Sequence, residues 1–350
     1  MSDSGSTTPI PNPFRPAADR VSGIPFMVGR RPRCVWEWGV TERTLAFLRG
    51  IDPAYFEHVG KINAPALETE KEKHYAALSI RTAYSHAVET FLGMLFAAIQ
   101  APQAMYGWIL EYDASDIRWL VERMNYGGTL PSPYKPPPAT WEEIAEMILQ
   151  PWNWGDEEST AKVKAGFART WRFFAHDFMD EAATDEYNSI KHGLRTKNGG
   201  FMMSWGLQDA PGQPAPAERM SPLYGSPFGT TYYKRERLDR LNFRARQLTR
   251  NWNPQAIVKA LNLASVSIHN VVNFARISLG DREDVSCRYP TDEADYSAPW
   301  VTNSVVITGG NWDAKLTLAD VRPLTEQEIR RRFQPATATP SAPQSPSPSP

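Results

Sequence analysis

Residues 185–196 read Asp-Glu-Tyr-Asn-Ser-Ile-Lys-His-Gly-Leu-Arg-Thr and bring several chemically useful side chains into one short stretch. On a helix, which turns by about 100° per residue, Tyr187, Ile190 and Leu194 would form an apolar stripe. An amide, two cations and an imidazole would share the flank beside it: Asn188, Lys191, His192 and Arg195. Such a face can bind phosphate, transfer a proton, or remain in water.

The spacing within this face suits acid–base chemistry. Asn188 and His192 are one helical turn apart, so both can reach the same ligand atom or water. The positive charges of Lys191 and Arg195 disfavour the protonated imidazole, and a neutral His192 could remove a proton from a ribose hydroxyl. The alternative is that these cations are solvated residues that oppose the negative end of the helix dipole. The sequence leaves both interpretations open.

The stretch from Tyr187 to His192, on a late helix among long antiparallel helices, resembles the Arg-polar-x-x-x-His motif of the HEPN superfamily. That superfamily includes nucleotide-binding modules and metal-independent ribonucleases of toxin and antiphage systems. The resemblance implies that His192 is catalytic, with Asn188 as its polar partner. Tyr187 stands where the family has Arg and is expected to contact the substrate, and phosphate binding falls to Lys191 or Arg195 beside it.

A looser match to the same pattern, Arg169 followed by His176, is also present, and the resemblance covers at most residues 67–280. It implies a nucleic-acid or nucleotide-handling protein, with metal-independent endoribonuclease activity in a bacterial defence or toxin system. RNA or a nucleotide is then the expected partner, and a homodimer the expected assembly. The alternative is a non-catalytic helical module that binds an anion or a partner at the same residues.

Three further features of the sequence could contribute to a site. Residues 234–250 are rich in arginine, which suits a phosphate backbone, although leucines at helical spacing favour an amphipathic packing helix with arginines in water. Arg81, His86 and Glu89 interrupt an apolar helix, where they would either face a cleft or be solvated or paired. Tryptophans could line a pocket, although buried packing is the simpler interpretation: Trp152, Trp154, Trp205 and Trp252.

Composition excludes several classes of protein. The 38 basic and 39 acidic residues give a net charge of −1, so attraction to nucleic acid would have to come from a local patch. Cys34 and Cys287 are distant and lack metal-ligand spacing, and no phosphate-binding Gly-rich loop or His-Glu-x-x-His is present. We therefore expect no metal and no cofactor. The sequence shows neither a signal peptide nor a membrane span, which predicts a cytoplasmic protein.

Apolar residues at intervals of three and four predict the helices that would position the site. We expect them over residues 67–100, 113–126, 140–150, 158–195 and 253–280. Thr140 and Glu143 form a capping box, and Asn253 with Pro254 begins the last helix. The two long later helices should pack against the first, because each has a wide apolar face.

The predicted fold class is all-α, a bundle of long antiparallel helices with a small C-terminal β-hairpin and disordered tails. Strand-like residues at 304–308 and 314–318 flank a Gly-Gly-Asn turn and predict that hairpin. The predicted division of the chain is an irregular arm, a bundle with an irregular insertion, a hairpin appendage and a Pro/Ser-rich tail: residues 1–32, 33–284 with 196–233 inserted, 285–333, and 334–350.

Overall fold

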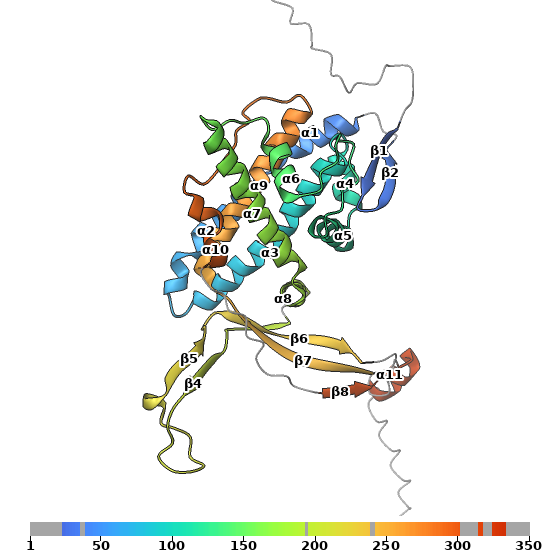
Figure 1. Cartoon of the computed structure of the whole chain (residues 1–350). Helices are drawn as coiled ribbons and strands as arrows, with labels where there is room; N and C mark the ends of the chain where they lie inside the picture. Colours follow the sequence, from blue (N-terminus) through green and yellow to red (C-terminus); the bar gives the residue numbers. More distant parts are fainter. Residues whose placement is uncertain are drawn as a thin grey trace, which may run out of the picture. The chain divides into compact units, whose positions relative to one another are not determined.

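The computed structural model describes residues 23–35, 39–192, 195–238, 242–301, 314–317 and 324–333. The chain separates into two units, one of residues 1–233 with 247–310 and the other of residues 234–246 with 311–350. Helices dominate the first unit (Figure 1). The helices are α1 (Val40–Gly50), α2 (Ala54–Asn63), α3 (Lys73–Gln100), α4 (Met105–Glu111), α5 (Ala114–Asn125), α6 (Trp141–Leu149), α7 (Glu157–Met179), α8 (Glu181–Lys191), α9 (Pro254–Ser278), α10 (Ala298–Val301) and α11 (Glu326–Phe333).

Helices α3 and α9 lie at the centre of the core. The C-terminal part of α3 is buried on every side from Phe91 to Gln100, and Leu95 and Leu261 are both fully inaccessible to solvent. Because α7 and α9 both pack against α3, the predicted arrangement of these long helices is confirmed. Among the described helices, none is long and apolar enough to cross a bilayer.

Helix boundaries with a polar cap were predicted best. Thr140 and Glu143 form the expected capping box at the start of α6, each side chain accepting from the other's backbone N–H. The side-chain oxygen of Asn253 caps α9 by accepting from the backbone N–H groups of Gln255 and Ala256, and Pro254 stands in the first turn. Local side-chain hydrogen bonds therefore determine these ends.

The single helix predicted for residues 158–195 is wrong, because Asp180 divides it into α7 and α8. Asp180 has an extended backbone, and its carboxylate accepts from the N–H of Ala182 to begin a new helix. Helix α8 ends at Lys191, and His192 has left the helical conformation. Arg195 therefore lies beyond the helix, and the predicted face from Asn188 to Arg195 is interrupted.

The all-α fold class is also wrong, because most of the strands occupy stretches that we expected to be irregular or helical. They are β1 (Ile24–Val28), β2 (Arg31–Val35), β3 (Thr196–Asn198), β4 (Met202–Trp205), β5 (Ser221–Gly225), β6 (Gly229–Arg237), β7 (Asn242–Asn251) and β8 (Ala314–Thr317). Strands β1 and β2 form an antiparallel hairpin across the boundary predicted at residue 32 between the N-terminal arm and the bundle, and β4 pairs with β5 within the predicted insertion. The protein thus combines a helical core with small antiparallel sheets.

The third sheet has the strand order β3-β6-β7-β8. In the first unit, Thr196 of β3 is opposite Tyr232 of β6, and hydroxyls of Thr231 and Thr249 join β6 to β7 at 2.8 Å. In the second unit, β7 pairs with β8. The strand at 314–317 therefore pairs with β7, whereas its predicted partner at 304–308 lies outside the described residues.

The amphipathic helix expected from residues 234–250 is likewise wrong, since these residues contribute to β6 and β7. Leu238, Leu241, Ala245 and Leu248 match a helical period. However, Arg244, Arg246 and Arg250 recur at even positions, which is the period of a strand. Pairing with neighbouring strands decides between the two periods, and that pairing is tertiary information.

Candidate functional site

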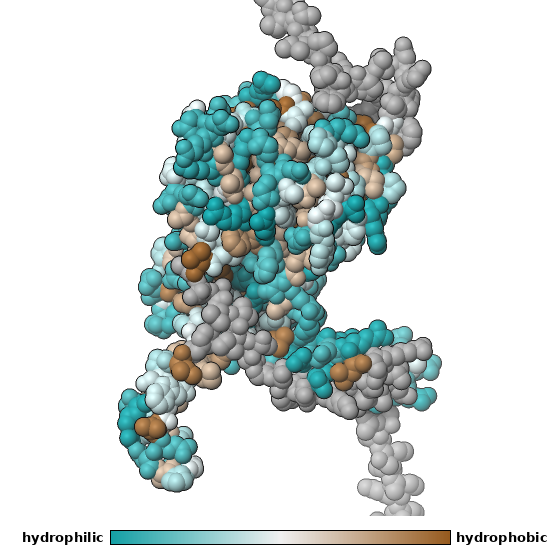
Figure 2. All heavy atoms as spheres, viewed as in Figure 1, coloured by the Kyte–Doolittle hydropathy of each residue, from teal (hydrophilic) through white to brown (hydrophobic). Residues whose placement is uncertain are grey.

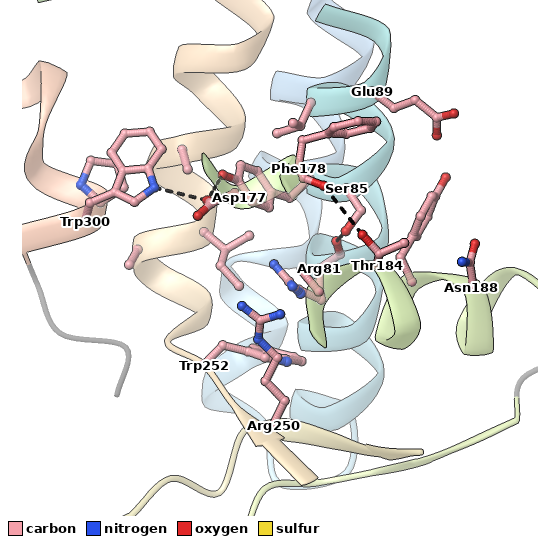
Figure 3. Close-up of a pocket in the computed structure, with 18 of the residues that line it drawn as sticks. Arg81, Ser85, Glu89, Asp177, Phe178, Thr184, Asn188, Arg250, Trp252 and Trp300 are labelled. Atoms are coloured by element: carbon pink, nitrogen blue, oxygen red, sulfur yellow. Dashed lines mark hydrogen bonds between the residues drawn. The ribbon is translucent and has the colours of Figure 1, made fainter. Parts of the chain in front are cut away.

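A pocket of about 200 Å³ lies in the first unit, between α3, α8 and the junction of β7 with α9 (Figure 3). One side of each helix faces it, because the lining residues recur at helical spacing. Helix α3 contributes Arg81, Tyr84, Ser85, Val88 and Glu89, and α8 contributes Ala183, Thr184, Tyr187, Asn188 and Lys191. The remaining wall consists of Ala114, Arg118, Asp177, Phe178, residues 250–253, Ala256, Ile257, Ala260, Pro299 and Trp300.

A buried ion pair fixes α8 against α3 at the base of the pocket. Oε2 of Glu186 accepts from Nε and Nη2 of Arg81 at 3.1 and 2.8 Å, and the two side chains are only 1% and 7% exposed. Oε1 accepts from the hydroxyl of Thr230 and, at 2.9 Å, from Nε1 of Trp252. Burial acts to lower the pKa of Arg81, but the Glu186 carboxylate raises it overall, so the guanidinium remains charged.

Arg250 brings a second guanidinium to the same region and points toward Arg81 (Figure 3). Its Nη2 donates to Oδ2 of Asp180 at 2.6 Å, and its Nε is 3.9 Å from Oε2 of Glu186. The Nη1 of Arg250 is buried and has no hydrogen-bond partner among the described residues. This nitrogen is therefore a donor that a ligand oxygen could satisfy.

Asn251 holds the segment that carries Arg250 and Trp252. Its side-chain amide pairs with the backbone of Phe201, accepting from the N–H at 2.9 Å and donating to the carbonyl at 2.8 Å. Gly200 allows this approach, because a Cβ there would be only 2.4 Å from the Asn251 amide oxygen. The β3–β4 connection thus positions one wall of the pocket.

Asp177 is a hydrogen-bond acceptor on the opposite side. Its Oδ2 accepts from the hydroxyl of Tyr84 and, at 3.1 Å, from Nε1 of Trp300. Burial acts to raise the pKa of Asp177, but hydrogen bonds from its neighbours, His176 first among them, lower it overall. Trp300 also stacks on Phe173 with ring centroids 4.7 Å apart, so both its edge and one face are occupied.

Two further cations lie over aromatic rings of the pocket. The guanidinium of half-buried Arg118 is 5.3 Å from the ring centroid of Phe178 and also donates to the hydroxyl of Thr184. The ammonium of Lys191 is 5.5 Å from the ring centroid of Tyr187. Because these contacts restrict both long side chains, their charges are held beside the cavity.

Tyr187 remains a neutral phenol. Burial and the nearby Glu89 carboxylate raise its pKa to about 12. Its hydroxyl is therefore able to donate and accept hydrogen bonds at neutral pH. Glu89 is half-buried, lines the pocket and supplies a hydrogen-bond acceptor (Figure 3).

The structure brings three of the five residues predicted from the sequence to this pocket. Tyr187, Asn188 and Lys191 line it, whereas His192 and Arg195 are not among the lining residues and are exposed. The backbone N–H of His192 donates to the Asn188 carbonyl at 3.0 Å. The catalytic roles of His192 and Asn188 stay predictions.

Several other lining residues were not among the five site residues predicted from the sequence. Arg81 and Glu89 both face the pocket, as the cleft interpretation of the first long helix supposed, while His86 is exposed and is not a lining residue. Trp252 also lines it. Arg118 was not predicted, and Arg250 was considered only as part of the arginine-rich segment 234–250, because only the fold brings these distant elements to one pocket.

The arrangement favours an anionic ligand with an aromatic part. Four lining residues are cations, against two carboxylates: Arg81, Arg118, Lys191 and Arg250 against Glu89 and Asp177. Glu186 and Asp180 partly balance this charge from behind the wall. No metal-binding group of three or more His, Cys, Asp or Glu residues occurs in the described part of the chain.

No protein-family model, curated protein or solved structure matches this chain.

Proposed function

We propose that the pocket binds a nucleotide, either free or at the end of an RNA chain. The observation that carries the proposal is the buried Nη1 of Arg250, which has no hydrogen-bond partner in the described part of the chain, at a cation-rich, aromatic-lined cavity. A buried donor without a partner costs about 1–3 kcal/mol. A phosphate oxygen at this nitrogen would remove that cost and form a charge-assisted hydrogen bond.

The other cations and rings have matching roles in this proposal. Arg118 and Lys191 supply further positive charge for the phosphate, and the phenol of Tyr187 supplies an aromatic surface for the base. Asn188 and Glu89 offer hydrogen bonds to base or ribose groups. The volume of about 200 Å³ is below the roughly 300–1,000 Å³ of ordinary ligand sites, which disfavours a larger cofactor and leaves part of a bound nucleotide outside the cavity.

The proposal is tested by isothermal titration calorimetry with nucleoside monophosphates, the matching nucleosides and inorganic phosphate. We expect the monophosphates to bind more tightly than either fragment. Arg118→Gln and Lys191→Gln should each weaken binding about tenfold or more, since a hydrogen bond to a charged group contributes about 1.5–3 kcal/mol. Lys162→Gln is the matched control, because Lys162 is exposed and pairs with Glu158 in a separate part of α7.

Absence of nucleotide binding by the folded wild type at millimolar concentration would refute the proposal. The non-catalytic interaction module would then be preferred. If the two pocket variants and the Lys162 control lose the same affinity, general charge rather than this pocket accounts for binding.

Cleavage of RNA is a separate part of the proposal and rests on the resemblance to HEPN ribonucleases. In that reaction His192 would act as the base and Asn188 would orient it, with Lys191 or Arg195 at the phosphate. His192→Ala should abolish cleavage of single-stranded RNA while leaving the fold and nucleotide affinity unchanged. A homodimer and a cytoplasmic location belong to the same proposal, and sedimentation and cell fractionation test them.

A further inference from the structure

The second unit carries a charge opposite to that of the rest of the chain. Its residues, 234–246 and 311–350, include eleven Lys and Arg against six Asp and Glu. The remaining residues of the chain include 27 basic and 33 acidic residues, so the overall charge of −1 conceals a strong separation. A local excess of this kind creates a positive potential that attracts polyanions.

The excess is concentrated on the described ends of β6 and β7. Residues 234–246 contain six basic and two acidic residues. Arg235 and Arg237 alternate with Lys234 and Glu236 along β6, and the two arginines are exposed while the other pair is half-buried. Because strand residues alternate between faces, Arg235 and Arg237 share the exposed face of this strand.

The opposite face is cationic as well. The Glu236 carboxylate lies between two arginines of β7, with its Oε2 at 3.3 Å from Nη1 of Arg246 and 4.0 Å from Nη1 of Arg244. The Glu236 carboxylate is thus shared by two guanidinium groups, and Lys234 is on the same face of β6. Arg244 is also opposite Lys315 in the register of β7 with β8. The described ends of β6 and β7, residues 234–238 and 242–246, thus form a ribbon with an excess of cations on both faces.

The spacing of these cations suits a linear polyanion. Residues two apart on a strand are separated by about 6.7 Å along the backbone, so Arg235 and Arg237 place two cationic side chains in succession along one exposed face. Guanidinium groups bind phosphate oxygens through paired N–H donors. Mainly hydrophilic residues cover the described part of this unit in the view of Figure 2.

Helix α11 adds further positive charge to the second unit. Its last turn contains Arg330, Arg331 and Arg332, all exposed, and ends at Phe333, which is 81% exposed. Glu326 pairs with Arg330 at 2.6 Å. Exposed aromatic rings beside arginines are the usual elements of surfaces on which bases stack.

We propose that the basic ribbon, residues 234–238 and 242–246, binds the phosphate backbone of a nucleic acid. This surface is distinct from the pocket of the first unit and does not depend on nucleotide binding there. Recognition is by charge, independent of sequence, and therefore weakens steeply with salt.

The test measures binding of the full chain to a labelled single-stranded RNA and to a double-stranded DNA by fluorescence anisotropy at several salt concentrations. The plot of log affinity against log salt for the wild type should have a slope of about −3 with the single-stranded RNA and about −4 with the double-stranded DNA, as four or five phosphate contacts predict. Arg235→Gln combined with Arg237→Gln should reduce affinity about tenfold or more and make the slope shallower by about 1.4 with the RNA and about 1.8 with the DNA. The nucleic acid that binds more tightly shows whether single-stranded RNA or double-stranded DNA supplies the phosphates.

Arg172→Gln combined with Arg282→Gln is the matched control, since it removes the same charge from exposed positions in the first unit. Affinity should remain within about twofold of the wild type. Equal losses in the two double variants, or a wild-type slope near zero, would overturn the proposal. Binding to vesicles of anionic phospholipid with none to either nucleic acid would overturn it as well and assign the ribbon to a membrane surface.

Discussion

Replacement of Glu186 by Gln should destabilise the protein more than any change at its surface ion pairs. The Glu186 side chain is fully buried and is the only carboxylate within hydrogen-bond distance of Arg81 among the described residues. Gln can still accept from Trp252 and Thr230, but it cannot neutralise the guanidinium. Breaking a buried pair by removing one partner costs about 3–5 kcal/mol.

Urea unfolding followed by circular dichroism measures this cost as a change in the free energy of unfolding. With the relation between the free energy of unfolding and Tm that holds for domains of about 150–250 residues, a loss of about 3 kcal/mol corresponds to a fall in Tm of roughly 6–12 °C. Glu142→Gln is the matched control, because Glu142 pairs with Arg172 at the surface and both are more than half exposed. Such a pair contributes about 0–1 kcal/mol.

A second variant separates loss of charge from loss of packing. Arg81→Met combined with Glu186→Gln removes both charges and should be more stable than Glu186→Gln alone, because no guanidinium is left without a counterion. A Glu186→Gln cost below about 1 kcal/mol, or a double variant less stable than the single one, would refute the reasoning that this pair holds α8 on α3.

Leu261→Ala should lower the free energy of unfolding by about 2–5 kcal/mol, because Leu261 is fully buried in the core; a change near zero in urea would show that the site collapses without cost. Asn253→Ala should cost about 1 kcal/mol through loss of the cap of α9, and equal stability of variant and wild type would contradict this. Hydrogen bonds from Arg49 and then Arg276 hold the pKa of Asp281 well below its ordinary value of 3.8. The ionised Asp281 therefore contributes fully to stability above pH 3.8, and this contribution is lost as pH falls toward the lowered pKa. Between pH 5 and pH 2 the free energy of unfolding should fall less in Asp281→Asn than in the wild type. Identical pH profiles of the two proteins would count against this assignment.

The long helices were predictable because their information is local. The apolar period along α3 and α9 repeats over many turns, and caps such as Thr140 and Asn253 make hydrogen bonds within three residues. The structure of the segment from Asp180 to His192 was harder to predict from the sequence. A helical period continues through it, but the Asp180 carboxylate begins a new helix and also binds Arg250, a contact across 70 residues.

The sequence by itself therefore determined the helical core and placed Tyr187, Asn188 and Lys191 on one helix face. Only the tertiary structure decided that Arg81, Arg118 and Arg250 join them, because these residues come from α3, α5 and β7 and meet through packing. It also decided that the arginine-rich segment is a ribbon rather than a helix. Strand hydrogen bonds are made with other segments, so the periodicity of one segment cannot specify them.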